Sequence, residues 1–231
     1  MDDAERLRRI GERAAAEVPD GALVGLGTGS TADAMLVALG ARVRDGLRVT
    51  GVATSEATSS RASSLGIPLV SIDEVTALDL CIDGADEIDP RINVVKGRGG
   101  ALLHEKLVAE RAARLVIIAS AEKLVNQLGT RLPLPVEIVP FGHTHTQRAI
   151  AALGITPTLR LTDDGSPFVS DGGHYILDCE TRGIADPEAL ASTLKGITGV
   201  VDHGLFVGLV SLALTVDEDG EITEHHAFER R

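Results

Sequence analysis

Short apolar segments alternate with helical segments through the first half of the chain, and this alternation restricts the fold more than any other feature. Strands are expected at residues 22–26, 47–53, 67–70, 78–82 and 115–119, and helices at 2–18, 55–66 and 100–114. The run Leu115–Ala119 is apolar at every position, which is typical of a strand buried on both faces of a parallel sheet. Alternation of this kind predicts a doubly wound α/β domain with a mostly parallel, Rossmann-like sheet.

The pattern changes after residue 130. Further elements are expected as a helix at 143–153, strands at 156–161 and 175–179, and a helix that starts at Asp186. Together with a strand-rich stretch before residue 143, they give a β-α-β-β-α-β order, which predicts a smaller, ferredoxin-like α+β domain at 131–204. Because 205–216 is expected to return a strand or two to the first sheet, the larger α/β domain is expected to comprise residues 1–130 and 205–231.

The charge balance excludes some classes of partner. The formal net charge is -12, so neither a nucleic-acid backbone nor an anionic membrane is expected as a partner. The N-terminal segment is a charged amphipathic helix rather than a signal peptide, and no apolar stretch reaches the length of about 18 residues needed to span a membrane. We therefore expect a cytoplasmic protein whose two cysteines, Cys81 and Cys179, are buried free thiols.

A glycine-rich loop, Gly25–Thr31, joins the first strand to a helix. The free N–H groups and the dipole of a helix N-terminus favour an anion, and the hydroxyls of Thr28, Ser30 and Thr31 add donors. The loop lacks a Gly-Lys-Ser/Thr sequence, and Ser30 stands where a dinucleotide loop has its third glycine. A phosphate site is favoured. The alternatives are a nucleotide site, in which Glu56 would bind the ribose, and a plain capped turn.

An acidic segment, Asp83–Asp89, follows the fourth expected strand. Charges at the end of a buried strand are unfavourable unless they are paired or used, and the carboxyl ends of strands form the ligand site in open α/β sheets. We expect Asp83 and Asp86 to hold sugar hydroxyls and to move protons; a magnesium site through the same two carboxylates is the alternative. Glu87 and Asp89 are expected to face solvent or to cap the turn.

A second glycine-rich turn, Lys96–Gly100, leads into the next helix, so its backbone forms another cradle for an anion. Glu105 lies one turn inside that helix and can point back toward the cleft; the alternative is an exposed helix glutamate beside Lys106. Lys123 comes just past the apolar strand at 115–119. Two cradles with carboxylates and lysines at the carboxyl edge of one sheet predict an active site there.

Six segments carry a resemblance to a known family: GLGTGSTA, TSEATSS, DGADEIDP, KGRGGALLHEK, LPLPVEIVPFG and GVVDHGLF. In this order they resemble the ribose-5-phosphate isomerases of the A type. The resemblance implies reversible conversion of ribose 5-phosphate to ribulose 5-phosphate in the pentose phosphate pathway, without a metal or an organic cofactor. It also implies Glu105 as the catalytic base. The substrate contacts that it implies are Thr28, Gly29, Ser30, Thr31, Asp83, Gly84, Ala85, Asp86, Lys96, Gly97, Arg98, Gly99 and Lys123.

Such an isomerisation moves a proton between C1 and C2 of the sugar through an enediolate. It needs one base that reaches both carbons and donors for the oxygens that become negative. We predict that Lys96 and the backbone of Gly97–Gly99 supply these donors, while Asp83 or Asp86 assists ring opening. The phosphate is then expected at the first loop and Lys123, although the two lysines can have the reverse roles.

The chain departs from the family pattern at three places. Leu7 stands where the family often has a phosphate-binding lysine, so that contact is either missing or made by a neighbouring arginine, Arg6, Arg8 or Arg9. His104 stands where an arginine often precedes the glutamate, and the segment after Phe206 fits the usual ending poorly.

Two other functions are the alternatives to an isomerase. One is a non-catalytic sugar-phosphate sensor, and the other is a deaminase or lactonase that acts on another sugar phosphate. As partners we expect a small-molecule sugar phosphate and further copies of the chain, in a homodimer or homotetramer.

Overall fold

The chain divides into two compact units. The computed structural model describes residues 1–226. The first unit contains Met1–Ala85, His104–Lys123 and the segment that starts at Gly208, and the second contains Asp86–Leu103 and Leu124–Val207. Residues 86–103 and 124–130, expected in the larger domain, cluster with the second unit, because short strands within 86–103 pair with one another and with residues 205–206. Residues 227–231 of the expected larger domain lie outside the described residues.

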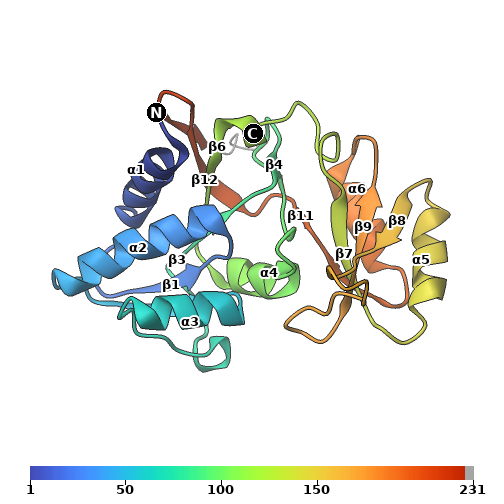
Figure 1. Cartoon of the computed structure of the whole chain (residues 1–231), viewed down its shortest axis with the longest axis horizontal. Helices are drawn as coiled ribbons and strands as arrows, with labels where there is room; N and C mark the ends of the chain where they lie inside the picture. Colours follow the sequence, from blue (N-terminus) through green and yellow to red (C-terminus); the bar gives the residue numbers. More distant parts are fainter. Residues whose placement is uncertain (227–231) are drawn as a thin grey trace. The chain divides into compact units, whose positions relative to one another are not determined.

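A six-stranded sheet organises the first unit (Figure 1). Its strands are β1 (Ala22–Leu26), β2 (Val49–Ala53), β3 (Leu80–Gly84), β6 (Leu115–Ser120), β12 (Val210–Val216) and β13 (Ile222–His226). They lie in the order β13-β12-β6-β3-β1-β2, and every neighbouring pair is parallel except β12 with β13. The predicted doubly wound, mostly parallel sheet is confirmed.

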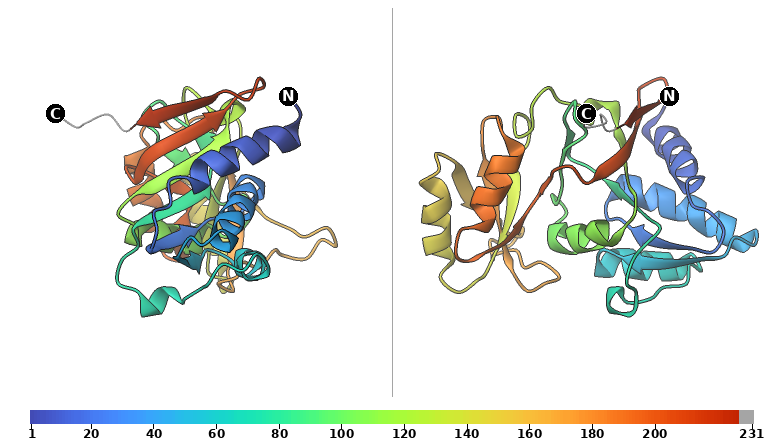
Figure 2. Two further views of the ribbon diagram at one scale, coloured as in Figure 1. Left: turned by 90° about the vertical axis from the view of Figure 1, so that its left-hand side faces the viewer. Right: turned by 180° about the vertical axis from the view of Figure 1, so that it is seen from behind.

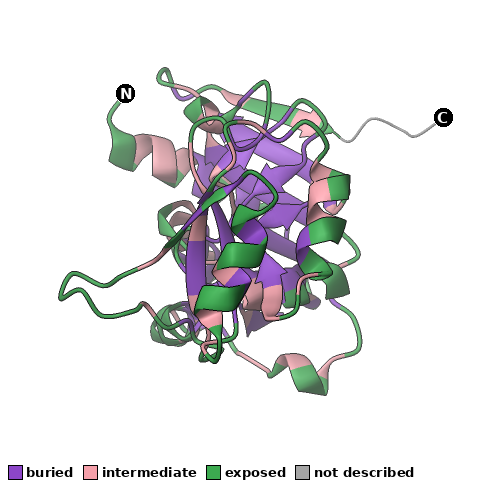
Figure 3. Ribbon diagram, turned by 90° about the vertical axis from the view of Figure 1, so that its right-hand side faces the viewer, coloured by how far each residue is buried: buried purple, intermediate pink, exposed green. Residues whose placement is uncertain are grey.

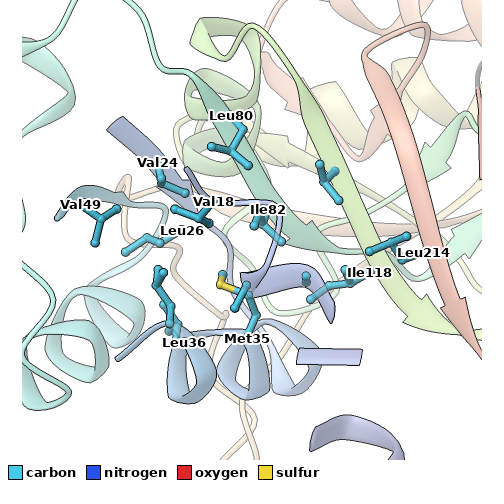
Figure 4. Close-up of a cluster of buried hydrophobic side chains, with 14 of the residues drawn as sticks. Val18, Val24, Leu26, Met35, Leu36, Val49, Leu80, Ile82, Ile118 and Leu214 are labelled. Carbon is cyan, nitrogen blue, oxygen red and sulfur yellow. The ribbon is translucent and has the colours of Figure 1, made fainter. Parts of the chain in front are cut away.

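Helices cover both faces of this sheet. On one face, α1 (Asp3–Ala15) and α2 (Ser30–Arg44) pack against alternate strand residues (Figures 2 and 4). This core includes Val24, Leu26, Leu80, Ile82, Ile118 and Leu214 from the strands and Met35 and Leu36 from α2. The residues between them point to the opposite face. There a side chain at Gly25 would touch Val108 of α4 (Leu102–Arg111), so α4 covers that second face.

The expected strand at 67–70 is wrong. This segment, which follows α3 (Glu56–Ser64), forms only an isolated bridge between Leu69 and Gly51 of β2. Gly51 donates to the Pro68 carbonyl, and Val70 donates back to the Gly51 carbonyl. Pro68 has no N–H of its own, so the ladder cannot continue through it. The chain instead turns into a short 3-10 helix, η1 (Ile72–Glu74).

The second unit has the predicted β-α-β-β-α-β order. Its elements are β7 (Leu134–Ile138), α5 (His143–Ala151), β8 (Thr156–Leu159), β9 (Tyr175–Glu180), α6 (Pro187–Lys195) and β10 (Val200–His203). The strands form an antiparallel sheet in the order β10-β7-β9-β8. Buried residues of this sheet, among them Val136 and Leu177, form one core with Leu194 of α6, and the outer faces of the helices are exposed (Figure 3). The ferredoxin-like α+β unit is therefore confirmed.

Residues 205–216 serve two sheets rather than one. We expected a strand or two of this segment to return to the first sheet, and β12 does so, but β11 (Leu205–Phe206) pairs with β5 (Val94–Val95), which pairs with β4 (Glu87–Ile88). Only β12 joins the six-stranded sheet. A two-residue strand carries too little pattern to assign its partner from sequence. Within residues 1–226, no helix combines the length and apolar character needed to cross a membrane.

Candidate active site

The loop between β1 and α2 lies against the end of β3. The Gly27 N–H donates to the Ile82 carbonyl over 2.9 Å, and the Thr28 N–H donates to Asp83 Oδ1 over 3.1 Å. A Cβ atom at Gly27 would lie 2.5 Å from the Asp83 Cα, so only glycine permits this close approach. The backbone of the loop and the Asp83 carboxylate therefore form one fixed assembly at the carboxyl edge of the sheet.

The Thr28 side chain belongs to a cluster of hydroxyl groups. Its Oγ1 lies 2.8 Å from Thr54 Oγ1, 2.9 Å from Ser55 Oγ and 3.0 Å from Thr58 Oγ1. Thr58 Oγ1 also donates to the Gly27 carbonyl over 3.0 Å. The hydroxyl that we expected to add a donor for an anion therefore ties the loop to β2 and α3. Thr54, Ser55 and Thr58 lie in the TSEATSS segment, but their role in holding the loop was missed.

The exposed part of the loop is the start of α2. Gly29 and Ser30 are both exposed, and Thr31 is half-buried. Within the described part of the chain, no side chain caps the N-terminus of this 15-residue helix. The first N–H groups of a helix have no acceptor inside it, and the helix dipole favours negative charge there. The start of α2 at residues 29–31 therefore favours an anion, and the phosphate site expected there stays a prediction.

Glu105 is buried on the same face of the sheet as Asp83. It lies in the first turn of α4 and is 4% exposed, so the alternative of a solvent-facing glutamate is wrong. Val108, three residues later on the same side of the helix, packs against β1 at Gly25 beside Cys81. Asp83 comes two residues after Cys81 in β3, so its side chain points to this same face.

The direction of α4 brings Glu105 to the carboxyl edge. The Leu78 N–H donates to the carbonyl of Arg111, the last residue of α4, over 2.9 Å. The helix therefore ends beside the start of β3 and runs antiparallel to it. Its first turn lies at the end of β3 that carries Asp83. Two buried carboxylates thus occupy the sheet edge at which ligands bind in this class of fold.

Gly84, Ala85 and Lys123 complete the predicted site residues of the first unit. The Gly84 N–H donates to Asp83 Oδ1 over 2.7 Å, and Ala85 is the last residue before the chain enters the second unit. Lys123 ends the short helix η2 (Ala121–Lys123), which follows β6 directly, and it is half-buried. Because β6 is the neighbour of β3, this lysine also lies at the carboxyl edge.

Lys96–Gly99 form a turn within the second unit. Lys96 is 2% exposed, and its Nζ lies 5.7 Å from the centroid of the Phe206 ring. The Lys96 N–H donates to the Gly204 carbonyl over 2.8 Å, while Arg98 and Gly99 are exposed at the tip. The structure thus groups one set of predicted residues around Asp83 and Glu105 in the first unit. It groups the other set around Lys96 in the second.

Asp86 is tied to this second loop. Its Oδ2 accepts from the Arg98 N–H over 3.1 Å, and its own N–H donates to the Val95 carbonyl over 2.8 Å. Asp89 caps the turn that follows, as predicted, because its Oδ1 accepts from the N–H groups of Arg91 and Asn93, both over 2.8 Å. The acidic segment is therefore a set of backbone anchors as well as a source of candidate catalytic groups.

The expected exposure of Glu87 is wrong. Its side chain is 1% exposed and accepts three backbone N–H bonds, from Gly129 at 2.5 Å, Arg131 at 2.8 Å and Leu132 at 2.9 Å. Burial is tolerated because these donors satisfy the carboxylate. Glu87 therefore fixes the segment that leads into β7, a long-range contact that no local pattern indicates.

Two of the three arginines that flank Leu7 pair with acids of α1. Arg6 pairs with Asp3, and Arg8 pairs with Glu5 and Glu12, both at 2.6 Å. The Glu5 and Glu12 carboxylates raise the pKa of the Arg8 guanidinium above its usual value. Leu7 between them is half-buried.

Another departure, His104, lines a cavity of about 470 Å³ that the sequence did not indicate. The cavity lies at the carboxyl end of β2, and its other lining residues include Ser55, Glu56, Leu69 and Glu74. No group of three or more histidine, cysteine, aspartate or glutamate side chains within residues 1–226 is arranged to hold a metal ion.

Both cysteines are buried, and neither forms a disulfide within residues 1–226, as predicted. Burial raises the pKa of the Cys179 thiol to about 12, and the negative charge of Asp178 adds to the effect. At pH 8, roughly one such thiol in 10⁴ is ionised, and the thiolate is the reactive form. We expect Cys179 to resist iodoacetamide in the native protein and to react after unfolding in guanidinium chloride, as measured by mass spectrometry of its tryptic peptide. Rapid native labelling would contradict the described burial.

Known proteins resemble this chain in both sequence and fold. The family model for ribose 5-phosphate isomerase A (phosphoriboisomerase A) matches residues 50–220. Ribose-5-phosphate isomerase A of Roseiflexus sp. (strain RS-1) is 53% identical over 229 residues, which cover 98% of each chain. The chain belongs to the ribose 5-phosphate isomerase A family. The family resemblance and the expected isomerase class are thus confirmed, and the sensor, deaminase and lactonase alternatives are not favoured.

Solved members of this family have the same fold. The enzyme of Methanocaldococcus jannaschii matches with a TM-score of 0.93 and 33% identity, over 97% of this chain and 100% of that one. A D-ribose-5-phosphate isomerase in complex with phospho-erythronic acid matches with a TM-score of 0.94 and 30% identity, over 98% and 100% of the two chains. The ribose 5-phosphate isomerase A fold therefore accounts for both units.

Proposed function

We propose that the chain interconverts D-ribose 5-phosphate and D-ribulose 5-phosphate through an enediolate, with Glu105 as the base. The observation that carries this proposal is the burial of Glu105 in the first turn of α4, on the face and at the edge that bear Asp83. A single carboxylate can take the proton from one carbon and return it to the adjacent carbon. Removing water from the site strengthens its interactions with the reacting groups.

The phosphate of the substrate binds at residues 28–31 and at Lys123 in this proposal. The uncapped start of α2 supplies backbone donors, and the lysine adds a positive charge against a net charge of -12. Binding energy from this remote group orients C1 and C2 toward the base. Arg6 and Arg8 pair with acids of α1, and this proposal assigns neither of them to the phosphate in place of the family lysine at position 7.

The remaining roles concern oxygen atoms of the sugar. Lys96 and the backbone of residues 97–99 stabilise the negative charge that develops on the enediolate. Asp83 or Asp86 moves the proton that opens the furanose ring. Phospho-erythronic acid, the compound bound by one solved relative, ends in a planar carboxylate that resembles an enediolate. We therefore expect it to compete with substrate in this chain.

The proposal extends to the setting of the enzyme. We propose a place in the pentose phosphate pathway, a cytoplasmic location and a homodimeric or homotetrameric state; membership of the family supports these proposals. Analytical ultracentrifugation of the purified chain distinguishes the two oligomeric states.

The test of the proposed function is direct conversion of ribose 5-phosphate to ribulose 5-phosphate, followed by proton NMR. In D2O, enediolate formation places deuterium from solvent at C1 or C2. We expect the same rate before and after dialysis against EDTA, because the proposed mechanism uses only side chains and backbone groups. Loss of activity on dialysis and recovery on adding Mg²⁺ would instead support a metal site at Asp83 and Asp86. Absence of conversion by the untreated protein would overturn the proposal itself.

A further inference from the structure

The loop Lys96–Gly100 is held from both sides at one residue, Arg98. The N–H of Arg98 donates to Asp86 Oδ2 over 3.1 Å, and the carbonyl of Arg98 accepts from Arg160 Nη1 over 2.8 Å. The Arg98 side chain itself is exposed. The backbone of Arg98 is therefore fixed on both sides. The donors that we assign to a substrate oxygen in this loop are the N–H groups of its neighbours Gly97 and Gly99, whose positions the fixed Arg98 backbone sets.

Arg160 is itself rigidly oriented. It follows β8 directly, and its side chain is mostly buried. Its Nε and Nη2 donate to the two carboxylate oxygens of Asp178 on β9, over 2.9 and 2.5 Å. This paired contact fixes the plane of the guanidinium group and leaves Nη1 directed at the Arg98 carbonyl.

Phe168 holds the other end of the loop. It lies in the long hairpin that extends from the sheet between β8 and β9 (Figure 2), and its N–H donates to the Arg160 carbonyl over 2.9 Å. Its ring lies 5.7 Å from the Arg160 guanidinium carbon. A Cβ atom at Gly100, where φ is +89°, would lie 2.5 Å from Phe168 Cζ. The hairpin thus packs directly on the end of the glycine-rich loop.

We infer that Arg160, oriented by Asp178 and packed on Phe168, is a positioning residue that fixes the Lys96–Gly100 loop for stabilisation of the enediolate. This inference rests on the proposed function, in which that loop contacts the reacting oxygens. Arg160 acts only through the loop. Donors aimed at charge that develops in the transition state affect kcat more than substrate binding. Loosening the loop is therefore expected to lower kcat with little change in KM.

The test compares Arg160→Gln with Arg160→Lys and with Arg148→Gln, a control at an exposed arginine of α5 in the same unit. We expect kcat of Arg160→Gln to fall by about 10- to 100-fold, since a displacement of about 1 Å can lower a rate about 100-fold. The kcat of Arg160→Lys should lie between that of Arg160→Gln and that of the parent. Lysine keeps a positively charged donor group but cannot make the paired contact of a guanidinium group with a carboxylate. The control should match the parent.

Hydrogen exchange shows whether the loss acts through the loop. In Arg160→Gln, amides of residues 97–101 should exchange faster, while those of β7 should keep the protection of the parent. A parent that isomerises, together with Arg160 variants that keep parental kcat, would overturn the inference alone. A loss of kcat without faster exchange in the loop, or with equal loss of protection in β7, would also overturn it, because the effect would then be general instability. A parent without isomerase activity would overturn the proposed function instead.

Discussion

Replacing Glu105 by glutamine is expected to lower kcat by about 10² to 10⁴-fold, the usual contribution of a general base. Glutamine has nearly the same shape but cannot accept a proton from carbon at neutral pH. The side chain is buried in the first turn of α4, so little rearrangement is expected on substitution. The steady-state assay with ribose 5-phosphate measures kcat, and calorimetry should give a substrate Kd close to that of the parent.

Glu110→Gln is the matched control for this experiment. Glu110 lies on the same helix, one residue before its end, and is exposed. It should keep parental kcat and thermal stability, because an exposed charge on a helix contributes little to either. If Glu105→Gln turned over at a rate near that of the parent, Glu105 could not be the base, although the family assignment would stand.

Replacing Gly27 by alanine is expected to lower kcat/KM by about 100-fold, the cost of a misplacement of about 1 Å in an active site. The new Cβ would lie 2.5 Å from the Asp83 Cα, so backbone rather than a flexible side chain must move. This movement would separate the loop that we assign to phosphate from the carboxylate that anchors it. Steady-state kinetics with ribose 5-phosphate, together with thermal melting, measures the effect.

Gly196→Ala separates this local effect from a general one. Gly196 follows α6 with an ordinary helical φ of -76°, and a Cβ there would make only van der Waals contacts, at 3.4 Å or more. It should leave both activity and melting temperature nearly unchanged. If Gly27→Ala kept parental kcat/KM, the tight packing of the loop against β3 would have no role in the reaction.

The sequence correctly placed the first glycine-rich loop between a strand and a helix, because the signals for this arrangement are local. A short, mostly buried apolar strand, a glycine pair and a helix start all fall within residues 22–31, so strand propensity and the glycines indicate the loop without any long-range information. Whether Glu105 is buried was harder to predict from the sequence. Its neighbours in sequence allow either an exposed or a buried position, and the contact of Val108 with β1 decides between them.

The side-chain roles that the sequence did not predict correctly are set by long-range hydrogen bonds. Glu87 was expected to face solvent or cap a turn, yet its acceptors serve N–H groups more than 40 residues away. The hydroxyl cluster around Thr28 joins residues 26 or more positions apart. The bond from Arg160 to Arg98 spans 62 positions. The residues next to a charged or hydroxylated side chain in the sequence do not indicate which distant polar group it will hydrogen-bond.

By itself, the sequence determined the class of each unit and the family, and it indicated the candidate residues to which we assign the chemistry. Periodicity and turn residues act over a few neighbouring positions, and the family motifs are long and contiguous. The tertiary structure decided which of those residues are buried, which act as anchors for loops, and that residues 86–103 cluster with the second unit. Burial and anchoring depend on partners that come together only when the sheets form. The free energy gained from burying side chains and from pairing their polar groups therefore depends on segments far apart in the chain.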